Sequence, residues 1–203
     1  MTREEEDILV AKIQNGNSTA FEELVIENQT KVYNLALRMV GNEQDAYDMS
    51  QEAFIKAYNS LALFRGESRF SVWLYRLTTN VCLDFLRSSG RRTHASLTFM
   101  SDEDDEKELE IPDERFSPET LVEKKELREA VNRGLMSLSK DYRAILLLRE
   151  IDGLSYEEIA EALALEEGTV KSRIFRARKR LCSILTADGN FSFGLTSKKT
   201  KEV

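Results

Sequence analysis

Residues 153–185 constrain the fold more than any other part of the chain. Ser155 and Glu158 have the S-x-x-E spacing of a capping box, which predicts a helix that begins just after Gly153. Residues 164–166 make a short connection, and a second helix follows them. Two helices joined by a tight turn are typical of a helix-turn-helix unit.

The second of these helices has two different faces. Its apolar side chains recur at spacings of three and four: Val170, Ile174, Ala177, Leu181 and Ile184. The opposite side carries Lys171, Ser172, Phe175, Arg176 and Lys179, flanked by Arg173, Arg178 and Arg180. Residues 168–185 contain six Lys or Arg and no acid. A solvated basic face is the alternative, but cap, turn and periodicity together favour a helix that enters the major groove of DNA.

The net charge of −7 does not argue against a nucleic-acid partner, because the acidity is concentrated in one stretch. Residues 102–119 contain ten acids and two bases, a net −8, so the rest of the chain carries +1. Helical periodicity is absent from this stretch, which also contains Pro112 and Pro118. We therefore expect a flexible acidic linker.

Two prolines, nine glycines and a helical apolar pattern almost throughout predict an all-α fold. We expect two small helical domains at 1–92 and 121–186, joined by a linker at 93–120 and followed by a disordered tail at 187–203. The expected helices cover 8–16, 18–41, 42–64, a stretch from Ser68 or Ser71 onward, a stretch from Pro118 to about Leu138, and 139–153. Tyr58 and Leu127 are placed on buried faces by this pattern.

Two further stretches are functional candidates. After a loop at 65–68, the next helix has an apolar stripe and, opposite it, a polar stripe: Trp73, Arg76, Asn80, Asp84 and Arg87. Such a stripe suits stacking and hydrogen bonding to exposed bases, although Trp73 fits a core position at the helix edge equally well. The helix before it exposes Asp45, Asp48, Gln51 and Glu52, for which a solvated polar face is favoured on spacing alone over a docking surface.

We find no pattern that predicts catalysis. The chain has no Gly-rich phosphate loop and no H-E-x-x-H, and His94 is its only histidine. Cys82 and Cys182 lack metal-ligand spacing, so we expect no catalytic residues, no metal site, no cofactor and a reducing, cytoplasmic environment. No apolar run is long enough to span a membrane, and MTREEED lacks the order of a signal peptide, so no direct membrane insertion is expected.

Two segments together resemble a known family. Residues 45–87, DAYDMSQEAFIKAYNSLALFRGESRFSVWLYRLTTNVCLDFLR, are similar to region two of the extracytoplasmic-function (ECF) sigma factors, the small alternative sigma subunits of bacterial RNA polymerase. Residues 138–181, LSKDYRAILLLREIDGLSYEEIAEALALEEGTVKSRIFRARKRL, resemble their region four. The second match alone is shared with response regulators, whereas the pair at this separation is distinctive.

The resemblance implies a non-catalytic sigma factor, and it implies these partners: core RNA polymerase, through the clamp coiled coil of its largest subunit and its beta flap, and promoter DNA. An anti-sigma factor is a further partner of many relatives. The residues implied for polymerase binding are Asp45, Asp48, Gln51 and Glu52, which makes the docking surface the favoured interpretation. Those implied for the −10 element are Arg65, Gly66, Ser68, Trp73, Arg76, Asn80 and Arg87. Those implied for the −35 element are Thr169, Lys171, Ser172, Arg173, Phe175, Arg176 and Lys179.

Two other functions compete with this one. A free-standing helix-turn-helix regulator would bind duplex DNA tightly without polymerase. A helical decoy would bind polymerase or another regulator without reading DNA, which the basic face of the last helix argues against.

Overall fold

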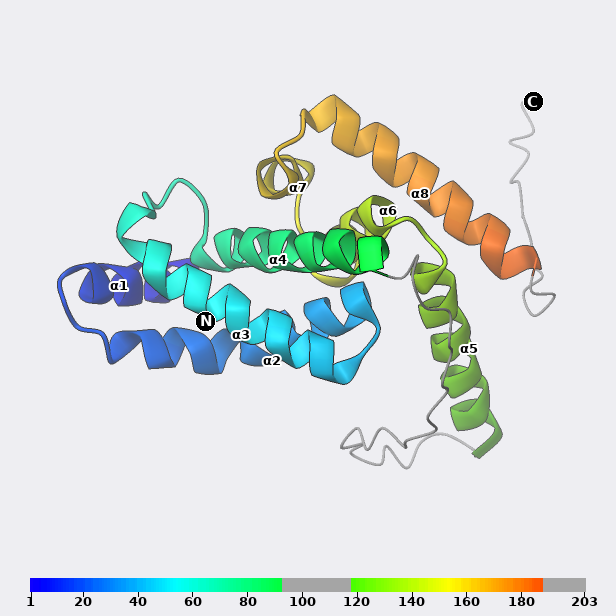
Figure 1. Cartoon of the computed structure of the whole chain (residues 1–203), viewed down its shortest axis with the longest axis horizontal. Coiled ribbons are helices and arrows are strands. Elements are labelled where there is room, and N and C mark those ends of the chain that lie inside the picture. The colour runs from blue at the N-terminus through cyan, green and yellow to red at the C-terminus, as the bar shows by residue number, and fades with distance from the viewer. Residues whose placement is uncertain (93–117, 188–203) are drawn as a thin grey trace, which may run out of the picture.

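The computed structural model describes residues 1–92 and 118–187, and every regular element in these ranges is helical (Figure 1). The first range contains α1 (Arg3–Gln14), α2 (Ala20–Val40), α3 (Glu43–Ser60), the 3₁₀ turn η1 (Leu61–Leu63) and α4 (Phe70–Arg92). The second contains α5 (Pro118–Met136), α6 (Lys140–Leu146), the π-helical turn η3 (Leu147–Ile151), α7 (Tyr156–Leu163) and α8 (Glu167–Ala187). The all-α class is confirmed. Most of the predicted linker and nearly all of the predicted tail lie outside the described residues.

Polar caps fix where several of these helices begin. The capping box expected at Ser155 and Glu158 is present, with the Ser155 amide donating to the Glu158 carboxylate at 2.7 Å. A second capping box, between Thr2 and Glu5, starts α1 five residues before the predicted start at Ile8. The short charged run after Thr2 lacks apolar periodicity, so only the cap indicates this helical turn.

The first hydrophobic core lies among α1, the first part of α2, α3 and the start of α4. Phe70, Leu24 and Leu74 are fully buried in it. The prediction that Tyr58 is buried was wrong, because the residue is 48% exposed. Its ring packs edge-to-face with Phe21, with 5.0 Å between the ring centroids. The α-helix also ends at Ser60 and continues as one 3₁₀ turn, rather than reaching Phe64.

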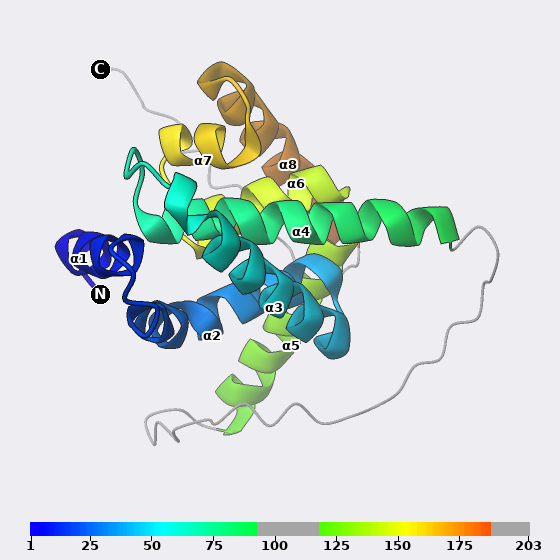
Figure 2. The ribbon, with the colours of Figure 1, turned by 60° about the vertical axis from the view of Figure 1, so that its left-hand side comes forward.

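The second core joins the two halves of the chain. It combines the end of α2, the outer face of α4 and the inner faces of α6, α7 and α8. Figures 1 and 2 show α6 and α7 lying against α4. Besides the predicted stripe, α4 therefore buries Val72, Tyr75 and Leu83. The apolar stripe in the sequence predicted only one buried face for α4, whereas the structure has two.

Helix α5 packs against the rest of the protein through its C-terminal part. Ala130 and Leu135 are buried, as predicted. Leu127 is 46% exposed, so its predicted burial was wrong. Figure 1 shows the beginning of α5 projecting away from the other helices.

Arg143 on α6 ties the two halves together. Its guanidinium is 7% exposed and donates to the carbonyls of Leu135 (3.1 Å), Met136 (2.7 Å) and Leu138 on the α5 side, and to the carbonyl of Met39 near the end of α2. A cation is thus placed against the C-terminal carbonyls of two helices, where the helix dipoles favour positive charge.

The turn between α7 and α8 contains the only non-glycine residue with positive φ among the described ranges. Ala164 has φ 51° and ψ 52°, and its amide caps the end of α7. An alanine in the left-handed conformation costs about 1–2 kcal/mol, and glycine avoids this cost. Part of the gain is offset because glycine loses more backbone entropy on folding than alanine does. We therefore expect Ala164→Gly to raise the free energy of unfolding by about 0.5 kcal/mol.

Thermal denaturation of Ala164→Gly beside Ala160→Gly checks this expectation. Ala160 lies inside α7, where glycine should instead cost about 1 kcal/mol. Equal losses in both variants would show that the turn is not strained.

Candidate nucleic-acid interface

The basic helix α8 is held on one side and open on the other. Val170, Ile174 and Ala177 are buried against α6 and α7, as the periodicity predicted. On the open side, Phe175 is 69% exposed, and Lys171, Arg176 and Lys179 are exposed as well. Ser172, Thr169 and Arg173 are partly buried. Four of the predicted −35 residues are therefore exposed on α8, and the other three lie partly buried beside them.

Two cations of α8 form ion pairs, one with another element and one within the helix. Arg178 forms an exposed ion pair with Glu150 of η3, with donor–acceptor distances of 2.5 and 2.9 Å. Lys171 pairs with Glu167 one turn earlier at 2.5 Å, and this hydrogen bond and its charge raise the pKa of Lys171. Lys171 also lies 5.6 Å from the centre of the Tyr156 ring. The ammonium group is thus kept charged and placed near the N-terminal end of the accessible face.

The loop between η1 and α4 is anchored at both ends to α1. Gln14 donates to the carbonyls of Leu61 and Phe64 at 3.0 and 2.9 Å. At the other end, Arg69 pairs with the buried carboxylate of Glu6 at 3.4 Å. Between these anchors Arg65 and Gly66 are exposed and Ser68 is partly exposed. Gly66 has φ +70°, a conformation that L side chains rarely adopt, so glycine suits this turn.

The aromatic side chains around this loop form one cluster. The Trp73 ring lies 5.0 Å from Phe64 and 5.8 Å from Phe70, and it is only partly exposed. Its surroundings are those of a core residue at the helix edge, so a base can reach only its remaining open side. Leu63, just before the loop, is 80% exposed. Leu63 is not among the residues predicted from the sequence. The sequence could have indicated it only as an apolar residue next to a predicted loop.

The polar stripe of α4 is accessible along its length. Arg76 and Asn80 are exposed, and they follow Trp73 on the same side of the helix. Arg87 is exposed too and donates to the carboxylate of Asp84 at 2.8 Å. The predicted −10 residues thus run from the anchored loop along one side of α4, with Trp73 beside the loop and Arg87 near the other end of the helix.

The acidic residues of α3 share a surface with apolar ones. Asp48 and Gln51 are exposed, while Asp45 and Glu52 are partly buried, and Glu52 pairs with Lys56 at 2.7 Å. The same side of α3 exposes Tyr47 (53%) and Ile55 (59%), which are not among the predicted polymerase-binding residues. Their helical spacing to Gln51 is four residues each way, so the pattern could have included them. A mixed acidic and apolar surface is better suited to a protein partner than a purely charged one.

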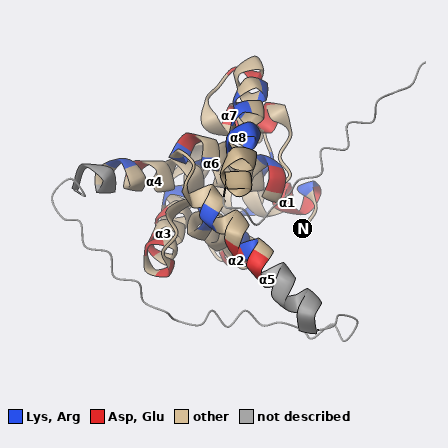
Figure 3. Cartoon of the chain, turned by 90° about the vertical axis from the view of Figure 1, so that its right-hand side faces the viewer, with Lys and Arg blue, Asp and Glu red and all other residues tan. Residues whose placement is uncertain are grey.

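Acidic and basic surfaces are therefore separated by element. Figure 3 shows acidic positions on α3 and basic positions along α8. Within the described ranges no group of three or more His, Cys, Asp or Glu side chains could hold a metal ion. No described helix is long and apolar enough to cross a membrane.

Comparisons with known proteins agree with this division. Residues 24–92 match the family model described as Sigma-70 region 2, and residues 128–181 match the one described as Sigma-70, region 4. The RNA polymerase sigma-H factor of Pseudomonas aeruginosa is 40% identical over 187 residues, which cover 89% of this chain and 94% of that protein. The ECF RNA polymerase sigma-E factor of Escherichia coli K12 is 43% identical over 176 residues, covering 87% and 92%.

A solved structure supports the same grouping. CnrH, determined in complex with the cytosolic domain of CnrY, aligns with a TM-score of 0.64 and 26% identity, covering 91% of this chain and 99% of that one. The two matched regions, the accessible basic helix and the relatives aligned over nearly their whole length lead to one conclusion: the chain belongs to the sigma-70 family, as an alternative sigma factor of the ECF group.

Proposed function

We propose that this chain binds bacterial core RNA polymerase, recognises a promoter at its −10 and −35 elements and helps to open the DNA. The observation that supports this most is the presence, in one chain, of an accessible basic helix in region 4 and an accessible loop and polar stripe in region 2. In this proposal the chain performs no bond chemistry and acts in the cytoplasm, where polymerase works.

The −35 element would be read as duplex DNA by α8. A helix fits the major groove, and arginine can donate two hydrogen bonds to guanine there. Arg176 is exposed on the accessible face beside Phe175 and one turn from Ser172. The exposed pair of Arg178 with Glu150 links α8 to η3, and the burial of Val170, Ile174 and Ala177 holds α8 on the scaffold.

The −10 element would be bound with its bases exposed. A base taken out of the stack needs a pocket or platform that stabilises it. Anchoring the loop of Arg65, Gly66 and Ser68 to α1 holds its backbone in place before DNA arrives. Arg76 and Asn80 would continue the path along α4, and Arg87 would contact phosphate.

The polymerase would be bound by α3. Asp45, Asp48, Gln51 and Glu52 would meet basic residues of the clamp coiled coil, with Tyr47 and Ile55 supplying apolar contact beside them. The beta flap would bind region 4. The sigma factor RpoE of Bartonella quintana, which has a similar fold, was solved in complex with the anti-sigma factor NepR. An anti-sigma partner of this chain stays a prediction.

Transcription in vitro tests the proposal as a whole. Purified chain and core polymerase should start transcripts from a subset of a promoter library, and neither component should do so alone. A gel shift with and without core enzyme separates this function from a free-standing regulator. Tight, specific duplex binding by the chain alone would favour the regulator.

Two arginines of α8 should behave differently when they are removed. We expect Arg176→Ala to cost about 1–3 kcal/mol of duplex affinity and to change the preferred upstream sequence. Arg180→Ala should weaken all sequences alike and lower the salt slope by about 1, as the loss of a phosphate contact does. Binding of holoenzyme to a randomised −35 library at several salt concentrations measures both. An unchanged sequence preference in Arg176→Ala would contradict the proposed role.

A further inference from the structure

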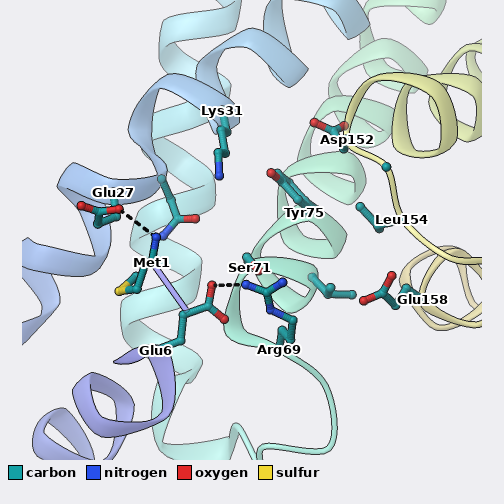
Figure 4. Close-up of a pocket in the computed structure, with 13 residues that line it drawn as sticks. Met1, Glu6, Glu27, Lys31, Arg69, Ser71, Tyr75, Asp152, Leu154 and Glu158 are labelled. Carbon is teal, nitrogen blue, oxygen red and sulfur yellow. Dashed lines mark hydrogen bonds and ion pairs between the residues drawn. The ribbon is translucent and has the colours of Figure 1, made fainter. Parts of the chain in front are cut away.

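A polar cavity of about 170 Å³ lies where the two halves of the chain meet (Figure 4). Its walls come from α1 and α2, from the start of α4, and from the segment between η3 and α7. Asp152 and Leu154 project from that segment toward Tyr75 of α4 and Lys31 of α2. The cavity therefore exists only while α5–α8 are packed against α2 and α4.

Three buried polar atoms around this cavity lack a hydrogen-bond partner in the described structure. They are Glu6 Oε2, Arg69 Nε and Asp152 Oδ2. Glu6 and Arg69 at least pair with each other through their other atoms, at 3.4 Å. Asp152 is partly buried and has no such pair, so the Oδ2 atom of its carboxylate loses hydration on closure without a direct replacement.

The charged and titratable groups around Asp152 come from several elements. They are Lys31 and Arg38 on α2, Glu27 on α2, Tyr75 on α4, Arg69 before α4, Glu6 on α1 and Glu158 on α7. Burial raises the pKa of Asp152 to about 6, although the charges of Arg38 and Lys31 act in the opposite direction. Burial, together with the charge of Asp152, raises the pKa of Tyr75 to about 12, so its hydroxyl stays protonated.

Other contacts between the halves use groups that do not titrate in this range. Arg143 donates to the Met39 carbonyl in either case. Met136 packs so closely on Gly41 that an added Cβ would lie 1.9 Å from its terminal methyl carbon. Apolar contacts such as Val72 with the Leu154 segment complete the interface.

We propose that the packing of α5–α8 against α2 and α4 is a reversible closure whose strength is set by protonation of Asp152. The closed form binds the proton more tightly than the separated form, in which the carboxylate is hydrated. Closure therefore strengthens as pH falls through 6 and stops strengthening near the usual aspartate pKa of about 4. From these two values, the closure constant should rise about fourfold between pH 7.5 and 5.5.

This device needs no assumption about DNA or polymerase. If the chain also acts as proposed above, closure keeps regions 2 and 4 in one body. Failure of the transcription assay would leave the closure intact, and failure of the closure would leave promoter recognition intact.

Cysteine accessibility in the full-length chain tests the proposal, even if separation is rare. Val72 is 4% exposed and lines the cavity, so Val72→Cys places a thiol that reagent reaches when the halves separate. Cys182→Ser removes the exposed native thiol, and Cys82→Ala removes the buried one, which belongs to the core between the halves. Global unfolding under the same conditions is measured separately by circular dichroism. A pyridyl disulfide reagent, which labels thiols at mildly acid pH, is used from pH 5.5 to 7.5.

The labelling rate is compared among three versions of this chain: Asp152 retained, Asp152→Asn, and the control Asp141→Asn, which removes an exposed carboxylate from α6. Dividing each rate by that of Asp152→Asn cancels the intrinsic pH dependence of the reagent. With Asp152 retained, and in the control, the ratio should fall about fourfold from pH 7.5 to 5.5. Asp152→Asn should label most slowly at pH 7.5.

Two results would overturn the proposal. One is a ratio that stays constant over this pH range. The other is labelling of the new cysteine no faster than global unfolding followed by circular dichroism, which would mean that the halves do not separate short of unfolding.

Discussion

Arg143→Met should lower the free energy of unfolding by about 3 kcal/mol, the largest stability effect that we expect from any single substitution. The methionine keeps the apolar stem but removes every donor. The carbonyls of Leu135, Met136 and Met39 would then remain buried without the guanidinium that they share. Each buried acceptor left without a partner costs about 1–3 kcal/mol, and relaxation of the two helix ends recovers part of that sum.

Urea unfolding followed by circular dichroism measures this loss. The matched control is Arg133→Met on α5, whose side chain is exposed and whose ion pair with Glu129 is long at 3.8 Å. Exposed pairs of that kind contribute less than about 1 kcal/mol. Arg143→Lys should fall between the two, because one ammonium group cannot serve carbonyls of two helices at once. If Arg143→Met unfolds like the control, the guanidinium does not join the halves.

Reversing two charges on α3 should abolish assembly with polymerase while leaving the fold intact. In Asp48→Lys with Glu52→Lys, two acids that face outward become bases opposite a basic partner. Like charges brought together at an interface cost several kcal/mol, so affinity should fall by at least about a hundredfold. Glu52 also loses its exposed pair with Lys56, which adds little to stability.

Copurification with core enzyme, followed by a titration, measures this effect. The matched control reverses Glu22 and Glu23 on α2, which are both exposed and give the same change in net charge. It should bind core enzyme normally, with a small loss of stability from bases placed in the first turn of a helix. If the α3 variant still copurifies with polymerase, the docking surface lies elsewhere.

Local features of this protein were determined by its sequence. The capping box at Ser155, the apolar stripe of α8 and the basic residues opposite it all follow from spacings within a single turn or two. Such signals depend only on neighbouring residues, which is why the helix-turn-helix and the all-α class were predicted correctly. The same holds for the exposed stripe of Arg76 and Asn80 on α4.

Features that depend on distant residues were decided only by the tertiary structure. The sequence placed Tyr58 and Leu127 inside because an apolar stripe does not show where its partner element ends. The burial of Tyr75 on a second face of α4, the carbonyls held by Arg143 and the dehydration of Asp152 all require α6 and α7 to pack across the N-terminal bundle. Periodicity shows the most apolar face of a helix. Contacts between segments far apart in the sequence depend instead on how the whole chain packs.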